Sequence, residues 1–290
     1  MLMVLATMGS VAVSPFPVTV PTLLATAIGT GLCSASANTL NQVQEVPFDA
    51  QMARTRNRPL VRRAVSALHA TSFGITSGIA GTAVLWTMVN PTTALLGAGN
   101  IVLYAGVYTW MKRQSVWNTW VGAVVGGIPT LMGWTATGGH LIPTNVHFFP
   151  PWEVVTTLDI ANVDNILSPF CLFMLLYTWQ FPHFNALSYV VRGSYAQAGY
   201  RMLSILDIRK NARVAVRYAF FMIPLCSVLM PLSGLTTWTF ALTSLIPNGI
   251  FAGATYQWWR HDCVVYLNRG QGQIYEHEGL SYQRQSEESA

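Results

Sequence analysis

The stretch VTVPTLLATAIGTGLCSASANTLNQVQEVPFDAQMARTRNRP, residues 18–59, changes character halfway along. Its first half is an apolar run with the length and composition of a membrane helix. Its second half, residues 41–59, carries two carboxylates and three arginines. The stretch therefore predicts a membrane helix with a charged functional site at its end.

The composition of the whole chain agrees with a membrane location. Of the 290 residues, 52% are hydrophobic and 9% are charged, whereas about 25% are charged in a typical soluble domain. The four cysteines have neither paired nor metal-binding spacing. Because only helices satisfy their own backbone in lipid at this hydrophobicity, we predict an all-α fold, a polytopic membrane helix bundle.

The apolar runs define the expected helices. A bilayer core about 30 Å thick needs roughly 20 apolar residues per helix. We predict eight transmembrane spans, at residues 1–14, 18–41, 68–89, 92–111, 117–138, 158–181, 212–231 and 235–256. Residues 1–256 are expected to form one transmembrane domain, and the polar residues 257–290 a disordered tail.

Lys and Arg are distributed asymmetrically between the two expected membrane faces. If the helices alternate, loops 42–67, 112–116 and 182–211 lie on one side, together with the tail. All 16 Lys and Arg then fall on that side or within one helical turn of it. The positive-inside rule assigns this basic face to the cytoplasm or, in a mitochondrion, to the matrix. No basic patch lies on a soluble domain, so we predict no nucleic-acid partner.

Three oxygen-bearing side chains near the end of the second span suggest a metal site. Asn41, Glu45 and Asp49 are four residues apart, which keeps them near one face of a helix. Such donors suit Mg²⁺, which is typically held by one or two carboxylates plus substrate phosphate oxygens. Pro47 predicts a kinked helix end, since Pro costs a helix interior about 3 kcal/mol. A solvated pair of loop carboxylates is the alternative interpretation.

Cations expected on the same face complete the pattern of a diphosphate site. Arg54 and Arg58 are four residues apart, and Lys112 and Arg113 come from another loop. Arginine presents a planar fork of donors that matches phosphate oxygens. The alternative is that these cations anchor helix ends at lipid headgroups, as we expect for Arg62, Arg63, Arg209, Lys210 and Arg217.

Spacing alone identifies no reaction, but several stretches resemble a known family. NQVQEVPFDAQMARTRNRPL, from residue 41, resembles the Asn-xxx-Asp/Glu-xxx-Asp motif of the UbiA-type intramembrane prenyltransferases. The following M-x-R-T-x-x-R-P resembles the protohaem IX farnesyltransferases within that superfamily. YTWMKRQSVWNTWVGAVVGGIPTLMGWTA at 108–136 and WQFPHFNALSYVVR at 179–192 agree, as does their spacing. EVPFD and WQFPHFNALS resemble the mitochondrial branch.

The resemblance implies a fold, a reaction and a location. The UbiA-type fold usually has nine helices, so we expect the first helix to be clipped here and the last to be missing. The implied reaction transfers a farnesyl group from farnesyl diphosphate to the 2-vinyl group of haem b. Water then adds, giving haem O, the precursor of haem A for cytochrome c oxidase. The implied location is the mitochondrial inner membrane, with matrix-facing active-site loops and with haem A synthase and oxidase assembly factors as partners.

The family motif also implies residue roles. By the resemblance, Mg²⁺ is held against the diphosphate by Asn41, Glu45 and Asp49. Four cations would contact phosphate oxygens: Arg54, Arg58, Lys112 and Arg113. Three tryptophans are available to stabilise an allylic cation, with core or interface packing as the alternative: Trp117, Trp134 and Trp179.

The second half of the chain supplies further expected contacts and one departure. His183, in the matching PHF, is expected to contact haem, since imidazole is a common haem-iron ligand; a structural His is the alternative. Tyr195 matches the family's Asp-Tyr-xxx-Gly loop and is expected to bind substrate. Ser194 replaces the acid of that loop and follows Gly193, and serine is a poor metal ligand. Asp207 is a weak substitute, so a second metal site is in doubt.

Two other functions remain open at the level of sequence. One is a UbiA-type prenyltransferase acting on a quinone or chlorophyll precursor, against which WQFPHF and MARTRNRP argue. The other is a transporter or haem-delivery protein that binds haem and catalyses nothing, which the missing acid at Ser194 favours. Such a protein would bind haem without depending on Glu45 or Asp49.

Overall fold

The structure is a computed structural model that describes residues 2–142 and 162–268, with the backbone alone for residues 262–268. Within these ranges all regular secondary structure is helical, which confirms the predicted all-α fold. The first half of the chain contains α1 (Leu2–Val13), α2 (Val20–Asp49), α3 (Ala67–Met88), α4 (Pro91–Ile101), the π-helical η1 (Val102–Tyr108), α5 (Thr109–Gln114) and α6 (Asn118–Ala136). The second half contains α8 (Leu167–Val190), α9 (Arg192–Gln197), α10 (Leu203–Leu206), α11 (Ile208–Pro224), the π-helical η2 (Leu225–Leu229), α12 (Met230–Leu232) and α13 (Trp238–Asn268).

Each of the eight predicted spans overlaps a helix in the described ranges. Three helical stretches are long and apolar enough to cross a membrane by length and composition alone: Val20–Asp49, Pro91–Gln114 and Ile208–Leu232. The predicted span at 158–181 is displaced, since α8 covers Leu167–Val190. The last helix continues to Asn268, beyond the predicted boundary at residue 256. Residues 269–290 of the predicted tail lie outside the described residues.

Local sequence explains where several helices begin. Asn90 caps α4, its side-chain oxygen accepting a hydrogen bond from the backbone N–H of Thr93 at 2.8 Å, and Pro91 occupies the first turn, where its missing N–H costs nothing. Ser66 caps α3 in the same way through the N–H of His69. Asn90 and Pro91 together therefore mark the start of α4.

Two prolines lie inside helices that the sequence led us to end earlier. α2 continues through Pro47 to Asp49, so the predicted kinked end is instead a continuous helix. Pro47 is two residues from the end, and its lost hydrogen bond therefore weakens only the last turn. α8 likewise passes through Pro182, which places His183 within a helix rather than at its end.

Close packing of α2 on α3 fixes the position of the helix that carries the acidic motif. A Cβ added at Gly81 of α3 would lie 2.9 Å from the carbonyl oxygen of Gly29 and from the backbone nitrogen of Cys33, both on α2. The two backbones can approach this closely only because Gly81 has no side chain. α2 therefore has little freedom to move sideways along this part of its length.

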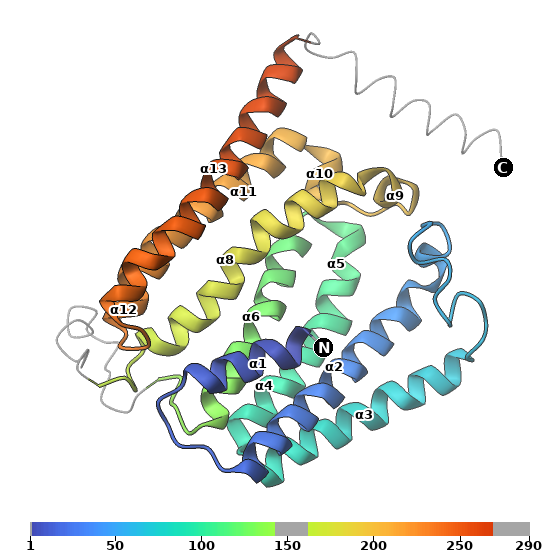
Figure 1. Cartoon of the computed structure of the whole chain (residues 1–290). Coiled ribbons are helices and arrows are strands. Elements are labelled where there is room, and N and C mark those ends of the chain that lie inside the picture. Colours follow the sequence, from blue (N-terminus) through green and yellow to red (C-terminus); the bar gives the residue numbers. More distant parts are fainter. Residues whose placement is uncertain (1, 143–161, 269–290) are drawn as a thin grey trace, which may run out of the picture.

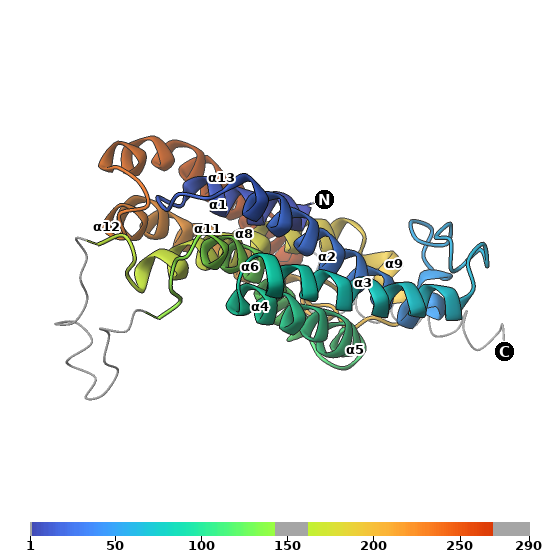
Figure 2. The ribbon, with the colours of Figure 1, turned by 90° about the horizontal axis from the view of Figure 1, so that it is seen from below.

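The segments that carry the predicted site gather at one end of the molecule (Figure 1). The C-terminal end of α2, the turns at residues 50–66, α5, α9 and α10 lie at this end, which we call the charged end. Figure 2 shows residues 50–66 and α9 again together after the molecule is turned. A backbone hydrogen bond of 2.9 Å from Arg201 to the carbonyl of Lys112 ties the loop after α9 to α5. The α1–α2 linker, the α3–α4 turn and α12 lie at the opposite end (Figure 1).

Candidate active site

The acidic motif forms a buried polar face on the last three turns of α2. Asn41, Glu45 and Asp49 are 4%, 5% and 1% exposed, so the four-residue spacing does place the three side chains on one inward face. This position excludes the alternative of a solvated carboxylate pair. Buried carboxylates require partners, because an isolated buried charge is strongly unfavourable.

Each carboxylate has one cationic partner. The ammonium of Lys112 on α5 donates to Glu45 Oε1 at 2.8 Å, and the Lys112 side chain is largely shielded while that of Glu45 is buried. Arg58 donates through one guanidinium nitrogen to Asp49 Oδ2 at 2.5 Å. Replacing a buried ion pair with apolar side chains is often neutral or stabilising, whereas breaking one costs about 3–5 kcal/mol. Stability alone therefore does not account for the Glu45–Lys112 pair.

One oxygen at the centre of this cluster lacks a partner. Asp49 Oδ1 is buried and accepts no hydrogen bond from the described residues, although Oδ2 of the same carboxylate is paired. A buried ionised oxygen without a donor is costly. The arrangement therefore fits a bound cation or another donor at Asp49 Oδ1.

Asn41 is held by the π-helical segment. Its Nδ2 donates to Thr109 Oγ1 at 2.8 Å, and the Thr109 hydroxyl in turn donates to the carbonyl of Tyr104 at 2.8 Å. Thr109 thus fills the wide turn of η1 and orients the Asn41 amide. With its nitrogen engaged, the Asn41 Oδ1 is the atom available to a cation.

The three oxygen donors fit a divalent cation that also binds ligand oxygens, rather than a cation coordinated by protein side chains alone. No group of three or more His, Cys, Asp and Glu side chains gathers in the described ranges. Two carboxylates and one amide oxygen leave positions open, as expected for Mg²⁺ shared with phosphate oxygens. Such a cation would be held by Asn41, Glu45 and Asp49.

The other predicted phosphate contacts divide into two groups. Lys112 and Arg58 lie in the cluster, and the Arg113 guanidinium lies 4.9 Å over the ring of Phe48 near the end of α2. Arg54, in contrast, is exposed and forms no ion pair with any described residue. The expected helical spacing of Arg54 and Arg58 fails because residues 51–65 form consecutive turns rather than a helix.

Three tyrosines line the cluster, of which the sequence indicated only one. The Lys112 ammonium lies 4.7 Å from the ring centre of Tyr108 and 6.0 Å from that of Tyr200. Tyr195, expected to bind substrate, is buried and packs edge-on against Tyr200 at 5.9 Å. Burial, followed by the negative charges of Glu45 and Asp49, raises the pKa of the Tyr200 phenol above its usual range. Tyr200 therefore remains a neutral hydrogen-bond donor beside the carboxylates.

A cavity of about 700 Å³ extends from this cluster into the bundle. This main cavity is lined mostly by apolar side chains of α1, η1, α6 and α8, and Tyr108 and His183 are among its lining residues. The ring of His183 stacks on Trp179 with centres 4.5 Å apart. Tyr108 borders both the cavity and Lys112, so the apolar space and the charged cluster are adjacent.

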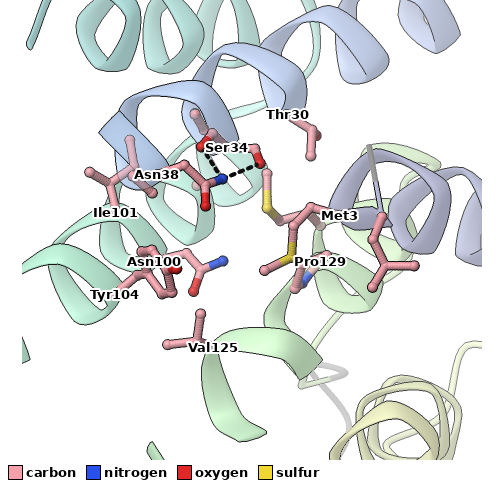
Figure 3. Close-up of a pocket in the computed structure, with 14 residues that line it drawn as sticks. Met3, Thr30, Ser34, Asn38, Asn100, Ile101, Tyr104, Val125 and Pro129 are labelled. Carbon is pink, nitrogen blue, oxygen red and sulfur yellow. Dashed lines mark hydrogen bonds between the residues drawn. The ribbon is translucent and has the colours of Figure 1, made fainter. Parts of the chain in front are cut away.

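A smaller cavity of about 250 Å³ lies beside the main cavity, and Figure 3 shows the residues that line it. Most of these residues are apolar, and we call the space the polar pocket for the polar ones among them. The two cavities share Leu2, Met3, Tyr104 and Val125 as lining residues. The polar pocket is bounded by α2 and α4 as well, and its polar lining residues include Thr30, Ser34, Asn38 and Asn100. None of these four was indicated as a site residue by the sequence.

The remaining candidates take structural positions. Trp134 is fully buried and bonds to the carbonyl of His140, while Trp117 is exposed and packs on Trp120. Only Trp179 of the three predicted tryptophans lines the main cavity. Asp207 caps α11 through the N–H of Lys210, which explains it without a metal.

The sequence profile of the UbiA prenyltransferase family matches residues 2–264. The chain belongs to the UbiA prenyltransferase family. Two solved members of similar fold are an apo UbiA homologue from Aeropyrum pernix and a digeranylgeranylglyceryl phosphate synthase. The first has a TM-score of 0.62 at 15% identity, and the match covers 93% of this chain and 89% of the homologue's chain. The second has a TM-score of 0.59 at 14% identity, covering 89% and 88%. At these identities they establish the UbiA fold alone.

Curated relatives are similar to this UbiA chain over most of its length. A mitochondrial protoheme IX farnesyltransferase of Yarrowia lipolytica is 45% identical over 263 residues, covering 91% of this chain and 51% of the relative. The enzyme of the same name from Eremothecium gossypii is 43% identical over 258 residues, covering 89% and 54%. The chain thus spans about half the length of the curated relatives it matches.

Proposed function

We propose that this chain transfers a farnesyl group from farnesyl diphosphate to the 2-vinyl group of haem b, giving haem O. The observation that carries this proposal is the pairing of two buried carboxylates, Glu45 with Lys112 and Asp49 with the partly exposed Arg58, beside a large apolar cavity. Paired charges of this kind suit a diphosphate and a cation, and the cavity suits an isoprenoid chain and a flat apolar acceptor. The names of the relatives at 42–46% identity support this choice of substrates.

The charged cluster would loosen the bond between the farnesyl group and its diphosphate. A divalent cation, which we propose to be Mg²⁺, supplies positive charge to the diphosphate when bound. Asn41, Glu45 and Asp49 would hold it, and the ammonium of Lys112 and the guanidinium of Arg58 would then donate to phosphate oxygens. Stabilising the leaving group in this way favours heterolysis of the allylic C–O bond. Arg113 lies close enough to α2 to join them, whereas Arg54 would have to swing inward from its exposed position.

The main cavity would hold the farnesyl chain and the acceptor. Its apolar walls exclude water from the allylic cation, and the stacked pair of Trp179 and His183 offers a flat face for a porphyrin. We propose that His183 contacts haem and that Tyr195 positions substrate through Tyr200. Since the relatives described above carry mitochondrial names, we further propose the mitochondrial inner membrane as the location, with the charged end facing the matrix. Haem A synthase and oxidase assembly factors are the proposed partners.

The test is a product assay with the purified chain. Haem b, farnesyl diphosphate and Mg²⁺ are combined in detergent or lipid, and the porphyrins are analysed by mass spectrometry. The proposal expects haem O in the complete mixture and none after chelation of divalent cations with EDTA. Haem that binds but stays unmodified, in folded protein, would contradict it.

One observation favours a second candidate, a haem-handling protein without catalysis. Ser194 stands where the family's second motif has an acid, and no third acidic or histidine ligand gathers near Glu45 and Asp49 in the described ranges. Haem binding that is unchanged when both carboxylates are replaced, together with no product, would support this candidate instead.

A further inference from the structure

The polar pocket contains buried oxygen atoms that the fold leaves without partners. Thr30 is 3% exposed, and its Oγ1 forms no hydrogen bond with the described residues. Its neighbour one turn earlier, Thr26, bonds instead to its own helix through the carbonyl of Thr22 at 2.7 Å. Asn100 Oδ1 is also buried without a partner. Unsatisfied buried oxygens of this kind call for a ligand that donates hydrogen bonds.

The geometry of the pocket narrows the chemistry of that ligand. Figure 3 shows Asn38 and Asn100 on facing sides of the space. Asn38 is exposed, and its Nδ2 donates to the carbonyl of Ser34 at 2.7 Å. The oxygen of an amide only accepts hydrogen bonds. A carboxylate such as a haem propionate does not fit, because the described lining contains no Lys, Arg or His to balance its charge.

The size and position of the pocket point to water. A hydrocarbon chain in this space would leave Thr30 Oγ1 and Asn100 Oδ1 unsatisfied. A buried water needs two to four polar partners, and Thr30 Oγ1 and Asn100 Oδ1 supply two within a lining that is otherwise mostly apolar. A volume of about 250 Å³ accommodates more than one molecule. The pocket and the main cavity share lining residues such as Tyr104 and Val125, so the two spaces are neighbours.

We propose that the polar pocket stores the water that becomes the hydroxyl group of the product, an inference that rests on the proposed function. The farnesyl C1–O bond breaks with its electron pair on the diphosphate, and C1 bonds to the outer vinyl carbon through the vinyl π electrons. The inner vinyl carbon is left as a cation. A water lone pair forms the new C–O bond there, and the released proton passes to the diphosphate. Thr30 and Asn100 act as positioning residues for this water.

The cation at the inner vinyl carbon can also react in a second way, and this competing reaction provides the test. Without a positioned water, the cation loses a proton from the neighbouring carbon and gives an alkene that is lighter than the alcohol by one water. The experiment measures the ratio of alcohol to alkene among farnesylated haems, in H₂¹⁸O, for Thr30→Val and Asn100→Leu. We expect the ratio to fall about three- to tenfold, as for the loss of one or two hydrogen bonds, with ¹⁸O in the alcohol that remains. The matched control is Thr26→Val, which removes a hydroxyl that is already satisfied.

The outcomes separate this inference from the proposed function. An unchanged ratio in both folded variants overturns the stored water while leaving farnesyl transfer in place. The absence of any farnesylated haem with the unsubstituted chain overturns the proposed function and this inference with it. Should the variants fail to fold, a high-resolution experimental structure of the unsubstituted chain decides. Ordered water on Thr30 Oγ1 supports the proposal, and a lipid or detergent tail in the polar pocket overturns it.

Discussion

A single oxygen, Asp49 Oδ1, distinguishes a binding site from an internal ion pair in this molecule. Every other charged oxygen of the cluster that is sealed from solvent has a donor, and this one has none among the described residues. If the ion pair were purely structural, apolar side chains could replace it at little cost, because a protein with such replacements is often as stable as one with the buried pair. The unpaired oxygen is therefore best explained by a ligand.

Asp49→Asn is expected to abolish farnesyl transfer, with a fall of about 10²–10³-fold, because it removes the charge and keeps the shape. Product formation is measured by mass spectrometry, and folding by gel filtration in detergent. The matched control is Asp164→Asn, which alters the pair between Asp164 and His140 at the opposite end and should leave turnover nearly intact. Full activity of Asp49→Asn would refute the metal assignment.

His183→Ala is expected to weaken haem binding about tenfold and to leave farnesyl diphosphate binding nearly unchanged. The side chain is exposed toward the main cavity and stacks only on Trp179, so its removal should not unfold α8. Haem affinity is measured by absorbance titration, with His69→Ala, another exposed histidine, as the control. Equal losses for both ligands would remove His183 from the haem site.

The sequence predicted helical features well where they depend on neighbours along one helix. The acidic face of α2 follows from a four-residue repeat, and it is present as expected. The sequence could not show that η1 would be π-helical, because VLYAGVY differs little from other apolar helical runs. The exposed position of Arg54 could not be read from the sequence for a related reason, since the turns after Asp49 have no regular period. Thr30, Asn38 and Asn100 were missed because small polar residues in apolar helices usually bond to their own backbone.

The packing of α2 on α3 makes a prediction about stability. Gly81→Ala is expected to destabilise the protein by about 1–3 kcal/mol, because the added methyl meets backbone atoms that cannot rotate away. Unfolding is followed by heat or by denaturant in detergent. Gly99→Ala on α4 is the control, since its Cβ would meet nothing within 4 Å. Equal stability of the two variants would contradict the close approach of α2 and α3.

Across the whole molecule, the loops with basic side chains lie together at the charged end (Figure 1). Arg58, Lys112 and Arg201 belong to segments that contact one another through side chains or backbone. The structure thus brings the basic loops together as the alternating topology required. The membrane face to which they belong remains a prediction.

Thiol labelling tests that topology. Single cysteines replace Arg56 at the charged end and Thr92 at the opposite end, both exposed, in a background in which Cys263 is changed to Ser. The other three cysteines are buried. In sealed mitoplasts a membrane-impermeant thiol reagent should modify the cysteine at 92 and spare that at 56 until the membrane is opened. Labelling of both from one side would contradict the alternating arrangement.

The π-helical segment η1 makes chain length itself a constraint. A π-helical turn holds about one residue more than an α-helical turn. Deleting one residue within it, such as Gly106, whose position is open, would let the helix return to regular form. An α-helical turn with one residue fewer covers about the same rotation as the π-helical turn that it replaces, so Lys112 would keep its direction relative to Asn100. A deletion in this segment should thus be better tolerated than one in the flanking α-helical turns, where each missing residue rotates everything after it by about 100° and would carry Lys112 away from Glu45.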